Sequence, residues 1–239
     1  MATRPFAVFD IDGTLIRWQL FHAIVDELGR QGHVSPDAYQ TIHRARTQWK
    51  HRSSQDSFRN YEHQLVKIYD QAVANLPVNI FLQAVRAVFE EYKDQTYAYT
   101  RDLIGELKTK SYLLFAISGS QQEVVKLLSD YYGFDDYAGS IYQQIDGRFT
   151  GQYDILRAER KISALEAMVA KHGASHAGSL AIGDSEGDIP MLEYASDAIA
   201  FNPTQTLFEY ARDKNWKVVV ERKNMIYKLE PSHGSYLLA

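Results

Sequence analysis

Acidic residues are concentrated directly after an apolar run near the start of this sequence. Residues 10–15 read Asp-Ile-Asp-Gly-Thr-Leu, so the carboxyl groups of Asp10 and Asp12 stand two residues apart. On a strand, residues two apart point to the same side, and Gly13 lets the chain turn immediately beyond them. The segment predicts two carboxylates that serve one site. The alternative is an ordinary loop in which the aspartates only favour the turn.

A second acidic segment, residues 183–188, reads Gly-Asp-Ser-Glu-Gly-Asp and places Asp184 and Asp188 four residues apart. At the same sheet edge as Asp10, these carboxylates would offer converging oxygen ligands, which suit Mg²⁺ and not a soft metal. The alternative is a structural loop that binds nothing.

A third segment, Ser-Gly-Ser at residues 118–120, combines hydroxyls with backbone N–H groups at the start of an expected helix. A helix N-terminus is a favourable place for a phosphate oxygen, and Ser118 is the candidate ligand. The alternative is that the serines only cap the helix, which applies above all to Ser120.

Each of these segments follows a short apolar run that is typical of a strand buried on both faces. The runs are Phe6–Phe9, Leu113–Ile117 and Ser179–Ile182, and two further candidates follow at Ala198–Phe201 and Lys217–Val220. Such strands indicate a parallel sheet covered by helices. The carboxyl ends of its strands would bring the three polar segments to one edge.

Helical patterns lie between these strands. After the second strand, Ser120 and Glu123 are spaced for a capping box, and Gly133 suits the end of that helix. Another helix is expected from Glu159 to His172, with Gly173 at its end. This alternation predicts an α/β fold with a doubly wound parallel sheet.

Residues 18–100 depart from this alternation, because they contain helix-length amphipathic segments and no convincing strand. The segments are Leu20–Gly29, Pro36–Lys50, Gln55–Ala74 and Val78–Gln95. They predict an all-helical cap domain at residues 18–100, inserted into an α/β core of residues 1–17 and 101–239. A β-hairpin is expected at Ile141–Tyr153, with its turn at residues 146–147.

The composition limits the class of protein. With 239 residues, 45% of them hydrophobic and 23% charged, disordered and fibrous classes are excluded. A net charge of −4 provides no basic field for nucleic acid, and the absence of Cys removes thiolate metal sites and cysteine nucleophiles. No signal peptide pattern and no apolar run of about 20 residues is found. We therefore expect a cytoplasmic protein without a membrane span and without a nucleic-acid partner.

The polar segments stand in the same order as the motifs of the haloacid dehalogenase superfamily, and the chain resembles the phosphotransfer branch of that superfamily. Asp10 and Asp12, followed by Gly-Thr, match the first motif, Ser118 the second, and Gly-Asp184-x-x-x-Asp188 the fourth. The resemblance covers essentially the whole chain and implies the core fold, with the site at the sheet edge.

The third motif of the superfamily is a basic residue ahead of the last of these strands. Lys161, 23 residues before Asp184, fits this position, and Arg157 and Arg160 are close competitors. The all-helical insertion and the hairpin at Asp146–Gly151 resemble the subgroup that includes phosphoserine phosphatases.

The resemblance implies a Mg²⁺-dependent phosphomonoesterase that acts on a small phosphorylated metabolite. Asp10 would attack phosphorus and form an aspartyl-phosphate, and Asp12 would act as general acid and then as base. The alternatives are a phosphotransferase or mutase with the same chemistry, in which a substrate hydroxyl replaces water, or a binding protein that keeps the fold without turnover. The last alternative would be expected to lack Asp10, Asp12 or an acid of the fourth motif, and all are present.

The resemblance also implies a role for each remaining site residue. Mg²⁺ would be held by the carboxylates of Asp10 and Asp184 and by the main-chain carbonyl of Asp12. Asp188 would orient Lys161 or a metal-bound water. The phosphoryl oxygens would be held by Ser118, the Gly119 N–H and Lys161.

Substrate choice is expected to depend on the helical cap. Phosphoserine phosphatases typically carry a Glu shortly after the first motif, where this chain has Gln19, preceded by Arg17. A neutral amide does not pair with an ammonium group as a carboxylate does, which disfavours phosphoserine without excluding it. In the basic segment 43–52, Arg46 and Lys50 share one helix face and could receive a second anionic group of a substrate. The alternative is a solvated basic face.

Overall fold

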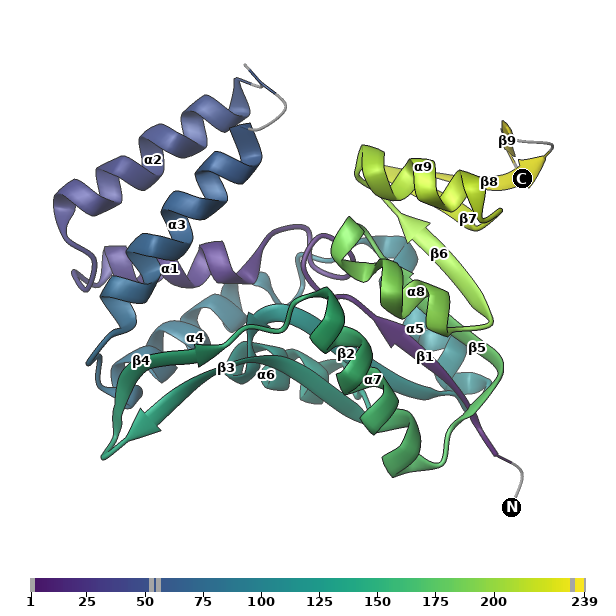
Figure 1. Cartoon of the computed structure of the whole chain (residues 1–239), viewed down its shortest axis with the longest axis horizontal. Coiled ribbons are helices and arrows are strands. Elements are labelled where there is room, and N and C mark those ends of the chain that lie inside the picture. The colour runs from purple at the N-terminus through teal and green to yellow at the C-terminus, as the bar shows by residue number, and fades with distance from the viewer. Residues whose placement is uncertain (1–2, 52–53, 55–56, 233–234, 239) are drawn as a thin grey trace. The chain divides into compact units, whose positions relative to one another are not determined.

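The computed structural model describes residues 3–51, 54, 57–232 and 235–238. The chain divides into two compact units (Figure 1). The first unit comprises Met1–Gln19, Tyr92–Ser140 and Ile155–Ala239, and the second comprises Leu20–Glu91 and Ile141–Asp154. In the described parts of the chain, no helix combines the length and the apolar character that crossing a bilayer would take.

A parallel sheet forms the centre of the first unit, as predicted. Its parallel strands lie in the order β3-β2-β1-β5-β6-β7, and β8 and β9 extend it with antiparallel pairing. Strand β1 is central because it pairs with both β2 and β5. The strands are β1 (Pro5–Phe9), β2 (Leu113–Gln121), β3 (Asp136–Ile145), β5 (Ser175–Gly183), β6 (Asp197–Phe201), β7 (Lys217–Arg222), β8 (Met225–Ser232) and β9 (Ser235–Leu238).

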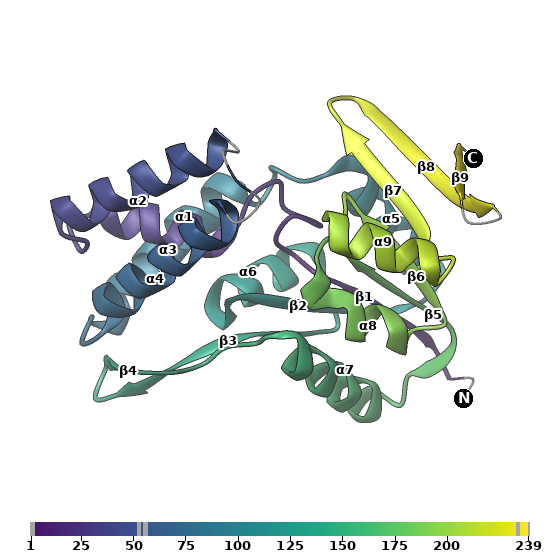
Figure 2. The same cartoon turned by 45° about the horizontal axis from the view of Figure 1, so that its top comes forward.

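Helices cover both faces of this sheet, which makes it doubly wound (Figures 1 and 2). Side chains of α7, α8 and α9 join the strands in one apolar core, in which the rings of Phe6 and Phe115 stack 6.0 Å apart. Helices α5 and α6 lie on the opposite face, behind the sheet in Figure 1. The helices are α5 (Ala98–Thr109), α6 (Gln122–Tyr132), α7 (Ala158–His172), α8 (Ile189–Tyr194) and α9 (Gln205–Asp213).

The helix ends agree with the sequence prediction in part. Gly133 and Gly173 end α6 and α7 with left-handed φ values of 65° and 58°, as expected. The capping box predicted between Ser120 and Glu123 is wrong, because β2 continues through Ser120 and Gln121 occupies the N-cap position. Ser120 instead belongs to β2, and its N–H donates to Ser118 Oγ at 2.9 Å.

The second unit consists of helices together with the β-hairpin. Its helices occupy most of the expected segments. Helix α3 begins at Ser57, and Gln55, where this helix was expected to begin, lies outside the described residues. Ser35 caps α2 through a 3.3 Å bond from the N–H of Ala38. The elements are α1 (Leu20–Arg30), α2 (Pro36–Lys50), α3 (Ser57–Val73), α4 (Val78–Tyr92), the end of β3 and β4 (Arg148–Asp154).

This division differs from the boundaries expected from the sequence, which placed residues 18–100 in the cap and the hairpin in the core. The hairpin groups with the helices because Phe149 packs on Phe81 at 4.9 Å and Tyr142 packs on Tyr69 at 5.4 Å. The segment after Glu91 groups with the core, where the Tyr97 N–H donates to the Leu15 carbonyl at 3.0 Å.

His22 is a buried imidazole in the second unit, with 1% of its surface exposed. It faces the ring of Tyr61 at 5.1 Å and the charge of Arg46, which is paired with Asp26 at 2.8 Å. Burial, and then the charge of Arg46, lower the pKa of His22 to about 3. Between pH 3 and about 6.5 the unfolded chain therefore binds a proton that the folded chain does not, so acidification favours unfolding.

We expect the free energy of unfolding of the second unit to fall by about 2 kcal/mol through His22 between pH 7.5 and pH 5. Urea unfolding of the wild-type protein and of His22→Gln at both pH values measures this difference, which the variant should lack. His33→Gln is the matched control, because His33 is exposed in the same unit and its removal should leave the pH dependence unchanged. An identical pH dependence in wild type and His22→Gln would contradict the assignment.

Candidate active site

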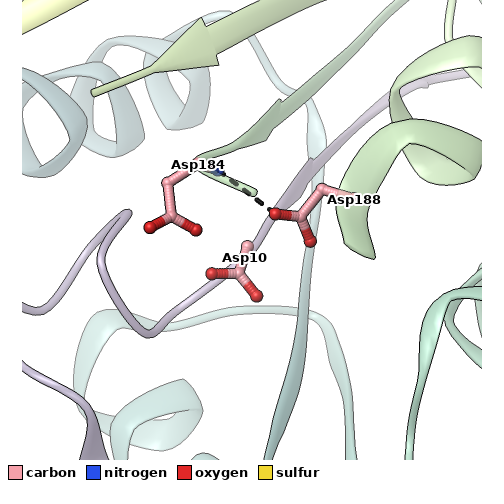
Figure 3. Close-up of side chains that lie close together, drawn as sticks. All are labelled: Asp10, Asp184 and Asp188. Carbon is pink, nitrogen blue, oxygen red and sulfur yellow. Dashed lines mark hydrogen bonds between the residues drawn. The ribbon is translucent and has the colours of Figure 1, made fainter. Parts of the chain in front are cut away.

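The carboxyl ends of β1, β2 and β5 bring the three polar segments together in the first unit. Asp10 follows β1 directly, and its N–H donates to the Ile182 carbonyl on β5 at 2.9 Å. Asp184 follows β5, and Ser118 lies near the end of β2. Figure 3 shows Asp10, Asp184 and Asp188 with their carboxylates turned towards one another. Because neighbouring parallel strands end at the same edge, segments far apart in sequence meet here.

Lys161 on α7 lies between two of these carboxylates. Its Nζ donates to Asp10 Oδ1 and to Asp188 Oδ1, each at 2.7 Å, and its side chain is 9% exposed. Arg157 and Arg160 are exposed on the same turn of chain. Of the three basic candidates for the third motif, Lys161 is therefore the one that the fold places against Asp10.

The crowding of acids at this edge shifts their titration. Burial raises the pKa of Asp10 to about 8; Lys161 opposes this shift, and the charges of Asp188 and Asp12 add to it. Burial and the neighbouring carboxylates also raise the pKa of Asp184 well above its usual range. Although burial acts against it, the pair of carboxylates raises the pKa of Lys161. The site is thus rich in negative charge, which a cation would stabilise.

The donor set fits a hard divalent cation. Carboxylate oxygens of Asp10, Asp184 and Asp188 lie within 4.8 Å of one another. Asp188 is already engaged, because its Oδ1 accepts from Lys161 and its Oδ2 accepts from the Asp184 N–H at 3.2 Å and from Ser185. Among the described residues, no hydrogen-bond donor contacts the carboxylate of Asp184. The oxygens of Asp10 and Asp184 are therefore suited to hold Mg²⁺.

Gly13 is required by the close approach of two chain segments. Its φ is 82°, in the left-handed region that favours glycine. A Cβ atom at this position would lie 2.2 Å from Asp184 Oδ2. The absence of a side chain at residue 13 therefore allows the turn after β1 to lie against the Asp184 carboxylate.

Ser118 and Asp12 form a buried pair beside this acidic cluster. The Ser118 hydroxyl donates to Asp12 Oδ2 at 2.6 Å and accepts from the Ser120 N–H at 2.9 Å. Ser118 is fully buried, Asp12 is 8% exposed and Gly119 is exposed at the end of the strand. The pair places a hydroxyl beside the second carboxylate of the first motif.

The residues suggested for substrate choice have other surroundings. Arg17 donates to Glu221 at 2.7 Å in the first unit, and Gln19 is the half-exposed last residue of that unit's first segment. Arg46 is held inside the second unit by Asp26 at 2.8 Å and by the Tyr61 hydroxyl at 2.9 Å, so its charge is already compensated. Lys50 is exposed on α2. Arg52, at the end of the basic segment, lies outside the described residues.

Sequence reasoning missed residues that support the site from a distance. Ser185 binds Asp188, Thr100 binds the main chain of the first motif, and Glu221 binds Arg17. Ser185 lies inside a segment already singled out, so its hydroxyl was a detectable signal. Thr100 and Glu221 stand in segments without any local motif, and their partners are 86 and 204 residues away.

Comparison with known proteins gives one family match and several relatives. The family of haloacid dehalogenase-like hydrolases matches residues 7–193. Phosphoserine phosphatase of Streptococcus thermophilus is 27% identical over 196 residues, which cover 81% of this chain and 82% of that protein. Histidinol-phosphatase of Neisseria meningitidis is 24% identical over 239 residues, which cover 90% of this chain and 98% of that protein.

A solved structure, the phospho-aspartyl intermediate analogue of a phosphoserine phosphatase, has a TM-score of 0.62 and 21% identity. The match covers 93% of this chain and 95% of that one, and it establishes a similar fold. The chain spans 41–42% of the length of the first curated relatives that it matches.

Proposed function

Because the chain belongs to the haloacid dehalogenase-like hydrolase family, we propose that it is a Mg²⁺-dependent phosphatase that hydrolyses a small phosphomonoester. The observation that carries this proposal is the position of Asp10, which contacts Lys161 at 2.7 Å and lies within 4.8 Å of the Asp184 carboxylate. A nucleophile, a phosphate-binding cation and a metal ligand are thereby gathered at one point.

Asp10 is the proposed nucleophile. One of its carboxylate oxygens forms a bond to phosphorus while the bond from phosphorus to the alcohol oxygen breaks, which leaves an aspartyl-phosphate. The carboxylates of Asp10 and Asp184 and the main-chain carbonyl of Asp12 would hold Mg²⁺, whose positive charge would offset the repulsion between carboxylate and phosphate. The ionised form of Asp10, which burial disfavours, is the form that attacks.

The phosphoryl oxygens are proposed to be held by groups around Asp10. Lys161 supplies a buried positive charge, and Ser118 and the Gly119 N–H supply hydrogen-bond donors at the end of β2. Such preorganised donors stabilise charge that develops in the transition state. Asp188 keeps Lys161 in place through its 2.7 Å bond.

Asp12 is the proposed proton carrier. It gives a proton to the leaving alcohol, and it then takes a proton from the water that attacks phosphorus and breaks the bond to Asp10. In the structure its carboxylate accepts from Ser118 Oγ at 2.6 Å, which holds it at the end of β2. The products are the free alcohol and inorganic phosphate.

We expect Asp12→Asn to slow hydrolysis of an alkyl phosphate by about a hundredfold to a thousandfold, because the alkoxide would leave unprotonated. An aryl phosphate with an acidic leaving group should be slowed far less in its first step. The measurement is kcat for both substrates, together with the burst of phenol that marks the first step. Equal slowing of the first step for both classes would contradict the role of Asp12 as an acid.

The substrate class is proposed from the relatives and from the surroundings of the site. The two curated relatives described above are named for phosphoserine and for histidinol phosphate, which are both small amines that carry a phosphomonoester. Gln19 is a neutral residue where phosphoserine phosphatases typically carry an acid, and this difference disfavours phosphoserine. Hydrolysis of phosphoserine and of histidinol phosphate should therefore be compared directly.

Phosphate release from a panel of phosphorylated metabolites tests the proposal. The panel includes phosphoserine, histidinol phosphate and a diphosphorylated sugar, each with and without Mg²⁺, and Asp10→Asn serves as the blank. Release that needs both Mg²⁺ and Asp10 is the expected result. Release that persists in the variant would overturn it. Phosphate transfer to an added alcohol without net release would favour the phosphotransferase alternative, and no reaction at all would favour the binding protein.

A further inference from the structure

Glu221, on β7, is a buried carboxylate that the proposed chemistry does not use. Its side chain is 3% exposed. Oε1 accepts from Arg17 Nη2 at 2.7 Å and from the Ala98 N–H at 3.1 Å, and Oε2 accepts from the Tyr99 N–H at 2.9 Å. One carboxylate therefore joins the last parallel strand to two other segments of the first unit.

One of these segments is the start of α5. Tyr97 occupies the N-cap position of this helix and makes no side-chain capping bond, and the first turn contains no acidic residue. The carboxylate of Glu221 takes that place from another element, because it accepts from the N–H groups of Ala98 and Tyr99. A negative charge at a helix N-terminus is also favoured by the helix dipole. Glu221 thus caps the N-terminus of α5 from another element of the fold.

The start of α5 in turn holds the turn of the first motif. The Thr100 hydroxyl donates to the Thr14 carbonyl at 2.9 Å, and this contact is buried. The Tyr97 N–H donates to the Leu15 carbonyl at 3.0 Å. Just beyond the turn, the Arg17 N–H donates to the Gln95 carbonyl at 2.9 Å. The residues that follow Asp12 are therefore fixed by the same segment that Glu221 caps.

We propose that Glu221 is a positioning residue, which holds the turn that carries Asp12 and Gly13 through α5 and Arg17. The turn packs closely on the acidic cluster, because a Cβ atom at Gly13 would lie 2.2 Å from Asp184 Oδ2, so a shift of the turn changes the geometry of the site. When Glu221 no longer holds α5 and Arg17, the turn moves and Asp12 loses its place beside Ser118. Small displacements of an acid or base lower kcat more than they change substrate binding.

Glu221→Gln tests this role, because an amide oxygen can keep only part of the three bonds and carries no charge for Arg17. We expect kcat to fall by about ten- to a hundredfold with KM changed by less than about twofold, on an aryl phosphate with saturating Mg²⁺. Hydrogen exchange of the main-chain amides at residues 13–17 should quicken by at least about tenfold. Thr100→Val removes the hydroxyl that donates to the Thr14 carbonyl at 2.9 Å and to the Tyr97 carbonyl at 3.4 Å, and it leaves Glu221 unchanged. It should change both quantities in the same direction and by less.

Asp136→Asn is the matched control. Like Glu221, Asp136 is a carboxylate of the first unit that binds both a basic side chain and a main-chain N–H. Its partners are Lys171 at 2.9 Å and the Tyr137 N–H at 3.0 Å. None of the contacts described for Asp136 involves the turn. It should leave kcat and the exchange of residues 13–17 unchanged. A lower melting temperature of Glu221→Gln with unaltered kcat and unaltered exchange in the turn would reduce Glu221 to a helix cap and overturn the proposal.

The kinetic part of this test rests on the proposed phosphatase activity, whereas the exchange part does not. If the wild-type protein hydrolyses no phosphomonoester, the proposed function fails, and exchange at residues 13–17 still decides the role of Glu221. If Glu221→Gln does not fold, Thr100→Val tests the contact between α5 and the turn through which Glu221 is proposed to act. Unaltered kcat together with unaltered exchange at residues 13–17 in Thr100→Val would then overturn the proposal.

Discussion

Asp10→Asn is expected to lower kcat by at least about 10⁴-fold while the protein remains folded. The amide is a poor nucleophile and cannot form the proposed covalent intermediate, so the step proposed for Asp10 would be lost and not merely slowed. The substitution conserves size and keeps an oxygen that can accept from Lys161 Nζ, which lies 2.7 Å from Asp10 Oδ1 in the wild type. It also removes one charge from a crowded group of acids, so the fold should not suffer.

Acid quenching tests whether a phosphoryl group is transferred to the protein and whether that transfer needs Asp10. Acid quenching of the wild-type reaction followed by intact-protein mass spectrometry should show one added phosphoryl group, and Asp10→Asn should show none. Asp135→Asn is the control, because Asp135 is a carboxylate of the first unit that accepts the Leu114 N–H at 2.8 Å and does not belong to the site. A phosphoryl group retained on Asp10→Asn would remove Asp10 as the nucleophile.

Lys161→Met is expected to cost both activity and stability. Loss of the cation leaves Asp10 and Asp188 buried without their partner, and breaking a buried ion pair in this way typically destabilises a protein by about 3–5 kcal/mol. Lys161 is also the cation proposed to face the phosphoryl oxygens, so its loss should lower kcat/KM by about 10³-fold.

The stability loss has a definite pH dependence. Without Lys161 the pKa of Asp10, already raised to about 8, would rise further, so the folded protein would take up protons more readily than the unfolded chain. The variant should therefore be closer to wild type at pH 5 than at pH 8 when both are unfolded in urea without metal. Lys171→Met on the same helix is the matched control, because Lys171 is exposed and its pair with Asp136 should contribute less than about 1 kcal/mol. Equal losses for the two variants would contradict the role of Lys161.

Much of the core follows from local patterns. The run Phe6–Phe9 is apolar throughout and ends at Asp10, and the protein folds it as a strand buried between two others. A continuous apolar run, which is typical of a strand buried on both faces, depends on neighbouring residues alone, so it can be read without knowing the fold. The same holds for the glycines at positions 133 and 173, since the helix end needs a left-handed residue there.

The boundaries between the two units and the surroundings of Arg46 did not follow from such patterns. Arg46 belongs to a basic segment, and its charge is compensated by Asp26, which is 20 residues earlier on another helix. The hairpin at Ile141–Asp154 groups with the helices because of ring contacts such as that between Phe149 and Phe81. Contacts between distant segments depend on how the helices and strands pack. Neither segment of such a contact carries a local sequence pattern that would reveal its partner.

The order of the polar segments was readable from the sequence because each one is a short stretch of neighbouring residues that follows a strand. Which basic residue meets Asp10 was not readable, since Arg157, Arg160 and Lys161 lie within five positions. The turn of α7 buries Lys161 between two carboxylates and leaves both arginines exposed. The reach of Glu221 to Arg17 and α5 likewise exists only once β7 lies beside β6 in the folded sheet. The residue types in the sequence indicate which chemistry is possible. The packing of the folded chain determines which of these residues lie together at the site.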